Sequence, residues 1–301
     1  MKQTSFDWSD LYFFLAVARA GRLTMAARRL GVDHSTVSRR IAALEAALHT
    51  RLFDRRQTGY TLTEQGERLL ASVEAIESTT GKIASQIGGA DTSAAGSVRI
   101  GSPDGFGALF LAPRLGKLLD AHPGLEIELM ATPRIFNLSK READLAIGLS
   151  RPKEGRLHAR KMTDYNLCLY AAPSYIAKRG PIRDRKDLIA HDFIGYIDDL
   201  IYAPELDYMA EIARDLRPRL KTSSPNAQLR ATAAGHGICM LPCFMAMTEP
   251  SLVPVLHKQI TLDRTLWLIM HSDMRDLARV RVTADFIVEQ VQSAKIWLKR
   301  P

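Results

Sequence analysis

Apolar residues recur at helical spacing in the first fifty residues and predict three short helices. The first helix has one apolar face, formed by Leu11, Phe14, Leu15 and Ala18. Ser9 can cap the start of this helix, and Gly21 can end it because glycine readily adopts the left-handed conformation found at helix ends. The second helix is expected between a capping Thr24 and a terminal Gly31.

A third helix is predicted from His34 or Ser35 onward, because Val37, Ile41, Leu44 and Leu48 follow at spacings of four, three and four. The exposed start of this helix carries polar groups only, on His34, Ser35, Thr36, Ser38, Arg39 and Arg40. Small residues allow close approach to DNA, and arginine can form paired hydrogen bonds with a guanine edge. A solvated charged face is the alternative, but three short helices with glycine ends favour a helix-turn-helix.

A hairpin is predicted after the third helix. Leu52 and Phe53 begin a strand, residues 54–60 turn, and the chain returns through 61–63. Arg55 or Arg56 near its tip could lie along a phosphate backbone or in a minor groove. Residues 19–56 contain nine arginines, no lysine and three acidic residues, so this segment carries +6 of the chain's net charge of +8.

A long helix is predicted from Thr63, with a seam of apolar residues at alternating spacings of four and three. The seam consists of Leu69, Val73, Ile76, Thr80, Ile83 and Ile87. Such a heptad pattern is typical of two helices that pair in a dimer, but a helix packed on its own domain would show it too. The small and polar stretch from Gly88 to Ser97 then predicts a hinge between two domains.

Beyond the hinge, short buried strands alternate with helices, which predicts an α/β sheet. The expected strands are 98–100, 125–130, 145–147, 167–171, 193–196, 238–241 and 266–270. The expected helices are 106–121, 228–234 and 276–291, and Pro113 should interrupt the first of them near its start.

Two loops of this α/β part are candidates for ligand binding, because ligands bind where strands end and helices begin. They are Gly101-Ser102-Pro103-Asp104-Gly105-Phe106 and Thr222-Ser223-Ser224-Pro225-Asn226. Both offer backbone amides and short hydroxyls that could hold a small polar group. Ordinary helix capping by Ser102, Asp104, Ser224 or Asn226 would explain the same residues. An ionised Asp104 would oppose a strongly anionic ligand.

Composition places limits on the class of protein. With 301 residues, 46% of them hydrophobic, the chain can bury the cores of about two domains. Three cysteines are too few for a disulfide framework, and the N-terminus lacks a signal-peptide pattern, so we expect reduced thiols in the cytoplasm and no membrane span. Cys239 and Cys243 lie four apart, which suits either a redox pair or small core residues.

Other functional classes lack support in the sequence. HExxH, GxSxG and P-loop motifs are absent, and the glycines at 101, 105 and 107 lack dinucleotide-binding spacing, so we expect no catalytic residue. The eight histidines are scattered and no Cys-x-x-Cys occurs, so neither a metal nor a cofactor is expected. A solute-binding transport protein could share the C-terminal architecture, but the DNA-binding segment argues against it.

The first domain resembles the N-terminal domain of LysR-type transcriptional regulators over FLAVARAGRLTMAARRLGVDHSTVSRRIAALEAALHTRLFDRRQTGYTLTEQGERLL. The resemblance lies in the alanine pair after Thr24, the Ser-Thr-Val-Ser-Arg start of the third helix, and the Leu-Phe and Leu-Thr-x-x-Gly that flank the hairpin. It implies DNA contacts through His34 to Arg40 and through Arg55, Arg56 and Thr58. His34 stands where many members have glutamine, which bears on base preference.

The C-terminal part is similar to the effector-binding domain of the same family, which has two α/β subdomains like those of type 2 periplasmic solute-binding proteins, with a cleft between them. The similarity lies in residues 96–101, 122–124, 143–148 and 234–238. It implies a small-molecule effector bound in the cleft. The implied contacts are Ser102, Pro103, Asp104, Gly105, Phe106, Thr132, Gly148, Ser224 and Asn226.

The sequence therefore predicts three parts: a helical, winged helix-turn-helix domain at 1–63, a dimerising linker helix and hinge at 64–95, and an α/β effector-binding domain at 96–301. Subdomain I should span about 96–162 and 267–301, and subdomain II about 163–266. The implied function is sequence-specific transcription regulation in response to an effector. The implied partners are two-fold-related double-stranded DNA, a second copy of the chain in a homodimer or tetramer, and RNA polymerase if the protein activates.

Overall fold

The structure is a computed structural model that describes residues 6–56, 59–87, 94–138, 142–152, 156–213 and 216–299. The chain divides into two compact units, residues 1–90 and 91–301. Each unit has its own hydrophobic core. A helical first unit with a hairpin and a mixed α/β second unit confirm the predicted fold class.

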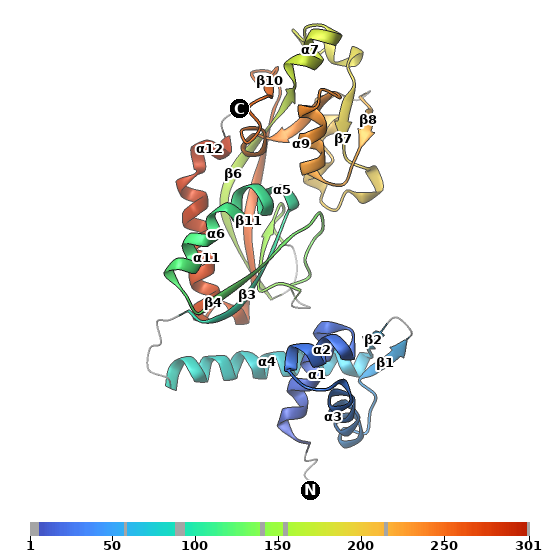
Figure 1. The fold of residues 1–301 in the computed structure, drawn as a ribbon, viewed down its shortest axis with the longest axis vertical. Helices are drawn as coiled ribbons and strands as arrows, with labels where there is room; N and C mark the ends of the chain where they lie inside the picture. Colours follow the sequence, from blue (N-terminus) through green and yellow to red (C-terminus); the bar gives the residue numbers. More distant parts are fainter. Residues whose placement is uncertain are drawn as a thin grey trace. The chain divides into compact units, whose positions relative to one another are not determined.

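The first unit consists of three short helices, a two-stranded hairpin and one long helix (Figure 1). In chain order these are α1 (Trp8–Ala20), α2 (Leu23–Leu30), α3 (His34–Ala47), β1 (Phe53–Arg56), β2 (Gly59–Leu62) and α4 (Glu64–Ile87). Phe14, Val37 and Leu44 are fully buried where the short helices meet. Their burial holds α3 against α1 and leaves the opposite side of α3 exposed.

The predicted helix ends agree with the structure better than the predicted helix starts. Gly21 and Gly31 end α1 and α2 with φ angles of 65° and 66°, as predicted. The predicted cap at Ser9 is wrong, because the carboxylate of Asp7 accepts the Ser9 amide hydrogen bond at 2.9 Å. The predicted cap at Thr24 is also wrong, because α2 begins at Leu23 and Arg22 is its N-cap residue.

The start of α4 packs closely against the backbone of Leu52, the residue before the hairpin. The Thr63 hydroxyl accepts a hydrogen bond from the Gly66 amide at 3.0 Å and so caps the helix. A Cβ atom on Gly66 would lie 2.2 Å from the carbonyl oxygen of Leu52, a distance that no side chain tolerates. The Leu-Thr-x-x-Gly motif is therefore explained by capping and by close backbone packing.

The first half of the predicted seam on α4 packs within its own unit. Val73 is buried, and Leu69 and Ile76 are half-buried against the core of the first unit. The side chains of Ile83 and Ile87 lie outside the part of the chain that the structure describes. Packing on its own domain therefore accounts for the seam as far as Ile76, and pairing with a second copy stays a prediction.

Within its described residues, the second unit contains one mixed sheet of nine strands in the order β4-β3-β5-β11-β6-β9-β7-β8, with β10 paired to β6 (Figure 1). The strands are β3 (Gly96–Ser102), β4 (Leu125–Ala131), β5 (Leu145–Gly148), β6 (Leu157–Ala171), β7 (Phe193–Gly195), β8 (Pro218–Lys221), β9 (Ile238–Pro242), β10 (Val253–Val255) and β11 (Thr261–His271). Strands β3, β4 and β5 are parallel at one end, and β7, β8 and β9 are parallel at the other.

The two long strands β6 and β11 connect the ends of the sheet. They pair in antiparallel fashion along almost their whole length, and the register shifts between Leu266 and Trp267. This shift falls at the predicted boundary between subdomains, which itself stays a prediction. The predicted strand at 167–171 is too short, because β6 begins ten residues earlier, where exposed polar residues such as Lys161 conceal the strand pattern.

The helices of the second unit pack on the sheet or connect its strands. They are α5 (Asp104–Phe106), α6 (Ala112–Ala121), α7 (Pro173–Arg179), α8 (Met209–Ile212), α9 (Pro225–Ala233), α10 (Cys243–Ala246), α11 (Ala278–Ser293) and α12 (Lys295–Lys299). A π-helical turn, Gly107–Leu111, joins α5 to α6. Pro113 lies in the first turn of α6, where proline is tolerated. The irregularity predicted near the start of this helix is the π-helical turn just before α6.

Candidate DNA interface and effector cavity

The start of α3 is an exposed polar surface on a rigid support. The Asp33 carboxylate accepts a hydrogen bond from the Ser35 amide at 2.8 Å and fixes the first turn. Val37 is buried and anchors the helix from below. His34, Ser35 and Arg39 are exposed, and Thr36 and Ser38 are half-buried. The helix therefore presents short polar groups and one exposed guanidinium.

Arg40 points in a different direction from Arg39. Its Nη1 atom donates to Asp7 at 2.9 Å and to Asp10 at 3.1 Å, and its guanidinium lies 5.6 Å from the centre of the Phe13 ring. Asp10 is only 3% exposed and depends on this partner. These contacts favour a role for Arg40 in holding α3 against α1 over a role in DNA contact.

The hairpin β1–β2 supplies the second basic surface of this unit. Arg55 is exposed and pairs with Tyr60 across the two strands, where its guanidinium lies 5.7 Å from the ring centre. Arg56 belongs to β1, but its side chain and residue Thr58 lie outside the described part of the chain. Arg22, Arg28, Arg29, Arg39, Arg51 and Arg55 are all exposed. So much positive charge on one unit suits phosphate contacts.

The two candidate ligand loops meet in the second unit. Ser224 Oγ donates to Asp104 Oδ2 at 2.7 Å, and Asn226 Nδ2 donates to Asp104 Oδ1 at 2.9 Å. Ser224 Oγ also accepts a hydrogen bond from the Ala227 amide at 3.4 Å, so it caps α9 as well. Capping and loop contact are therefore both present at Ser224.

The other predicted effector contacts, Ser102, Thr132 and Gly148, are engaged within the second unit in other ways. Ser102 is fully buried, and its hydroxyl donates to the Pro103 carbonyl at 3.2 Å within its own loop. Thr132 Oγ1 is buried without a hydrogen-bond partner among the described residues. A Cβ atom on Gly148 would lie 2.5 Å from Ile269 Cδ1, so this glycine packs against the neighbouring strand.

A small cavity of about 40 Å³ lies beside the Asp104 loop. Of the predicted contacts, Pro103, Gly105 and Phe106 line it. The sequence did not point to the other aromatic residues of the wall, which are Tyr165, Tyr196, Tyr202 and Phe244. Tyr196 ends the predicted strand 193–196 and follows directly after β7, and Tyr202 lies in the irregular segment beyond it. No sequence signal marked either of them as a cavity residue.

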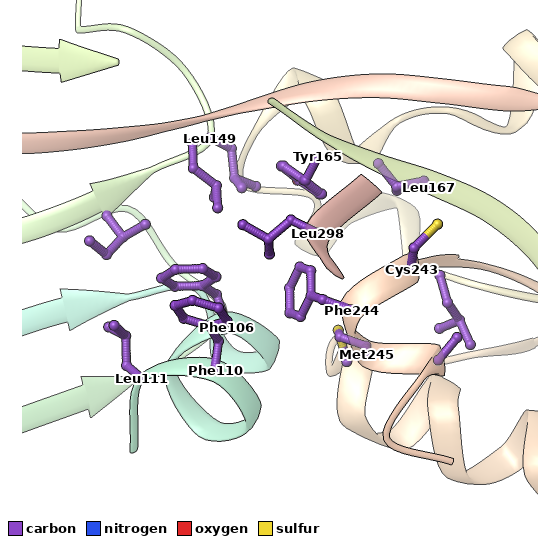
Figure 2. Close-up of a cluster of buried hydrophobic side chains, with 14 of the residues drawn as sticks. Phe106, Phe110, Leu111, Leu149, Tyr165, Leu167, Cys243, Phe244, Met245 and Leu298 are labelled. Carbon is purple, nitrogen blue, oxygen red and sulfur yellow. The ribbon is translucent and has the colours of Figure 1, made fainter. Parts of the chain in front are cut away.

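An aromatic cluster joins the elements on both sides of this cavity (Figure 2). Phe106 stacks on Phe110 with ring centres 4.7 Å apart, and it meets the edge of Phe244 at 5.8 Å. Tyr165 lies edge-on to Phe244 at 6.0 Å. Figure 2 shows Phe106 and Phe110 on one side and Phe244 and Met245 on the other. Their packing holds the α5 side of the sheet against α10.

The tyrosines of the cavity wall stay protonated at neutral pH. Burial, together with a smaller effect of the negative charge of Asp104, raises the pKa of Tyr202 to about 12. Burial also raises the pKa of Tyr196 well above its usual value. Their hydroxyl groups are therefore neutral, and each can donate a hydrogen bond.

The contacts between the cysteines differ from the pairing of Cys239 with Cys243 that their spacing in the sequence allowed. Cys239 Sγ donates weakly to Gln228 Oε1 at 3.7 Å, while a hydrogen bond from Cys243 lowers the pKa of Cys168 to about 7. All three cysteines are buried. The nearest thiol partner of Cys243 is thus Cys168, which leaves Cys239 as a core residue.

Among the described residues, no group of three or more His, Cys, Asp or Glu side chains is arranged to hold a metal ion. None of the described helices combines the length and apolar composition needed to span a bilayer.

A helix-turn-helix with exposed arginines, followed by an α/β unit in which two loops that lead into helices meet, is typical of a DNA-binding transcriptional regulator of the effector-responsive class. Residues 8–67 match the model of the bacterial regulatory helix-turn-helix proteins of the lysR family, and residues 91–292 match that of the LysR substrate binding domain. The chain belongs to the LysR family of transcriptional regulators. It is therefore a regulator and not an enzyme, as the resemblance in its sequence predicted.

Relatives match over nearly the whole chain. The HTH-type transcriptional regulator CrgA of Neisseria meningitidis serogroup C is 26% identical over 94% of this chain and 96% of its own. The Mau operon transcriptional activator of Paracoccus denitrificans is 27% identical over 94% and 97%. The solved structure of CrgA from Neisseria meningitidis has a TM-score of 0.60 at 24% identity, covering 95% and 99%. Full-length OxyR C199D from Pseudomonas aeruginosa has a TM-score of 0.75 at 16% identity, covering 96% and 98%. These structures share the fold.

Proposed function

We propose that this protein reads a two-fold-related operator with the start of α3 and the β1–β2 hairpin, and that an effector in the aromatic cavity alters this binding. The observation that carries the DNA half is the exposed Arg39 on a capped, well-anchored helix start. The observation that carries the effector half is the contact of Asp104 with Ser224 and Asn226 beside the cavity. A ligand that favours the joined loops can thereby change how the DNA-binding units are held.

Replacing Arg39 with alanine tests the DNA half. We expect operator binding to weaken by about 1–3 kcal/mol and discrimination between sequences to relax, because a guanidinium that reads a base edge is lost. The measurement is competition binding against specific and random duplexes at several salt concentrations. Arg55→Ala should instead weaken all duplexes evenly, since a phosphate contact carries no sequence information.

Arg40→Ala is the matched control for Arg39→Ala. It should lower the melting temperature of the protein, because Asp10 loses its cationic partner while it stays buried. Arg39→Ala should leave the melting temperature unchanged. Unaltered affinity and specificity in Arg39→Ala would exclude the start of α3 as the reading surface.

We further propose a homodimer through α1 and α4, assembly of dimers into tetramers through the second unit, and contact with RNA polymerase if the protein activates. Two copies of the reading unit suit a two-fold-related site. Trp8 and Tyr12 lie one turn apart on α1, which packs on α4, and they are 68% and 63% exposed. An exposed aromatic pair of this kind is a typical interface anchor.

The double variant Trp8→Glu/Tyr12→Glu should dissociate into monomers without loss of folding, because both side chains are exposed in the single chain. Multi-angle light scattering gives the mass, and circular dichroism checks the fold. Met25→Glu, on α2 and also exposed, should keep the wild-type mass. Ile76→Asp is a poorer test, since Ile76 packs on its own core. An unchanged mass in the double variant would rule out this face.

A further inference from the structure

We propose that the ion pair between Arg19 and Glu77 is a positioning contact that sets how far apart two DNA half-sites must lie for this protein to bind both. Arg19 lies near the end of α1, and Glu77 lies past the middle of α4. The inference rests on the proposed function, in which α1 and α4 hold two copies of the first unit on one operator. It adds which residues fix the angle between the DNA-reading helices and α4.

The first argument is the geometry of the pair. Arg19 Nη1 donates to Glu77 Oε1 at 3.0 Å, and Arg19 Nη2 donates to Glu77 Oε2 at 2.7 Å. The two side chains are only 26% and 38% exposed, so water shields the pair incompletely. Two parallel hydrogen bonds between planar groups restrict the orientation of the groups as well as their distance. The pair therefore constrains the direction of α4 relative to α1.

The second argument is the position of Glu77 along α4. Among the described residues, the apolar side chains of α4 that pack on the first core lie between Leu69 and Ile76, and Glu77 follows directly. Thr80 is exposed, and Figure 1 shows the later part of α4 extending beyond the three short helices. From Glu77 to Ile87 the helix runs about 15 Å, so a rotation of about 20° at Glu77 moves its end by about 5 Å. That displacement exceeds the length of one base pair, about 3.4 Å along the DNA axis.

The third argument is a second charged contact at the other end of α1. Arg40 of α3 pairs with Asp7 and Asp10 at the start of α1, whereas Arg19 pairs with α4 near the end of α1. Helix α1 therefore has a charged contact to α3 at one end and to α4 at the other. Loss of the Arg19 contact would free the angle between α3 and α4 without changing the exposed start of α3.

The test measures binding to duplexes that differ only in the spacing of their half-sites. The full-length wild-type protein first selects an operator from random duplexes, and single base pairs are then inserted or removed between its half-sites. Arg19→Met should reduce the preference for the best spacing over its neighbours roughly 3- to 10-fold, because each of the two copies loses one ion pair. Its affinity for a duplex with one half-site and its melting temperature should stay close to those of the wild type, because a partly exposed ion pair contributes little to stability.

Three further variants complete the test. Glu77→Gln removes the same pair from the other helix, should reduce the spacing preference in the same way, and decides the matter if Arg19→Met fails to fold. Arg19→Glu/Glu77→Arg exchanges the two charges and should recover the preference that Arg19→Glu alone loses. Arg68→Met is the control, because Arg68 pairs with Glu64 on α4 itself, and it should keep the wild-type preference.

An unchanged spacing preference in Arg19→Met and Glu77→Gln would overturn the proposal, as would an equal loss in Arg68→Met or no recovery in the charge-exchanged variant. Weaker binding of Arg19→Met to a single half-site would overturn it too, since Arg19 would then be a DNA contact. The outcomes also separate the two proposals. A wild-type protein that selects no operator with two half-sites contradicts the proposed function. A wild-type spacing preference that survives in both variants contradicts only the positioning role.

Discussion

Replacing Phe244 with alanine should lower the free energy of unfolding of the second unit by about 3–5 kcal/mol, because a large buried ring is lost and the space it leaves cannot close. Phe244 is 2% exposed. The centre of its ring lies within 6 Å of the ring centres of Phe106, Tyr165 and Trp297, so the truncation affects contacts from three separate elements. Figure 2 shows Phe106 and Tyr165 near Phe244. Urea unfolding followed by circular dichroism measures the change.

Ile296→Ala provides the control for this prediction. Ile296 lies on α12 next to Trp297, but it is 83% exposed, so its truncation should change the stability by no more than about 0.5 kcal/mol. Similar losses in both variants would mean that the aromatic cluster does not stabilise the second unit.

The double variant Ser224→Ala/Asn226→Ala should have the second large effect. It leaves the half-buried carboxylate of Asp104 without either donor, and two hydrogen bonds to a charged group contribute about 3–6 kcal/mol together. We expect the loops to separate and the amides at the start of α9 to exchange faster. Hydrogen exchange followed by mass spectrometry measures this directly on the full-length protein.

Ser102→Ala is the matched serine variant. Among the described residues, its hydroxyl bonds only to the Pro103 carbonyl in the same loop, so its loss should leave the exchange at α9 unchanged. The sequence alone treats Ser102 and Ser224 alike, whereas the structure separates their roles. A larger effect from Ser102→Ala than from the double variant would contradict the contact between the loops.

The sequence predicts those features that depend on local signals. Helix spacing and two terminal glycines are enough to define α1 to α3, because each helix buries one apolar face. The two candidate ligand loops follow from the rule that ligands bind where strands end and helices begin, and their role in binding stays a prediction. In both cases the residues that carry the signal lie within a few positions of one another.

Features that depend on distant partners could not be predicted. Arg40 has the same local pattern as Arg39, and its contacts with Asp10 on α1 and with Asp7, the N-cap residue of α1, turn it inward. Tyr202 lies in an irregular segment, and only the packing of the whole sheet brings it to the cavity. Side-chain direction and cavity walls are tertiary properties, so they need the structure.

The pairing of β6 with β11 limits how the second unit can move. Both strands pass from one end of the sheet to the other, hydrogen-bonded to each other on the way, and their register shifts between Leu266 and Trp267. A bulge of this kind increases local twist and bending. A two-stranded ribbon resists stretching and sliding but can twist about its length. Any ligand-driven change should therefore be a small rotation about one axis, of limited amplitude, centred on the bulge.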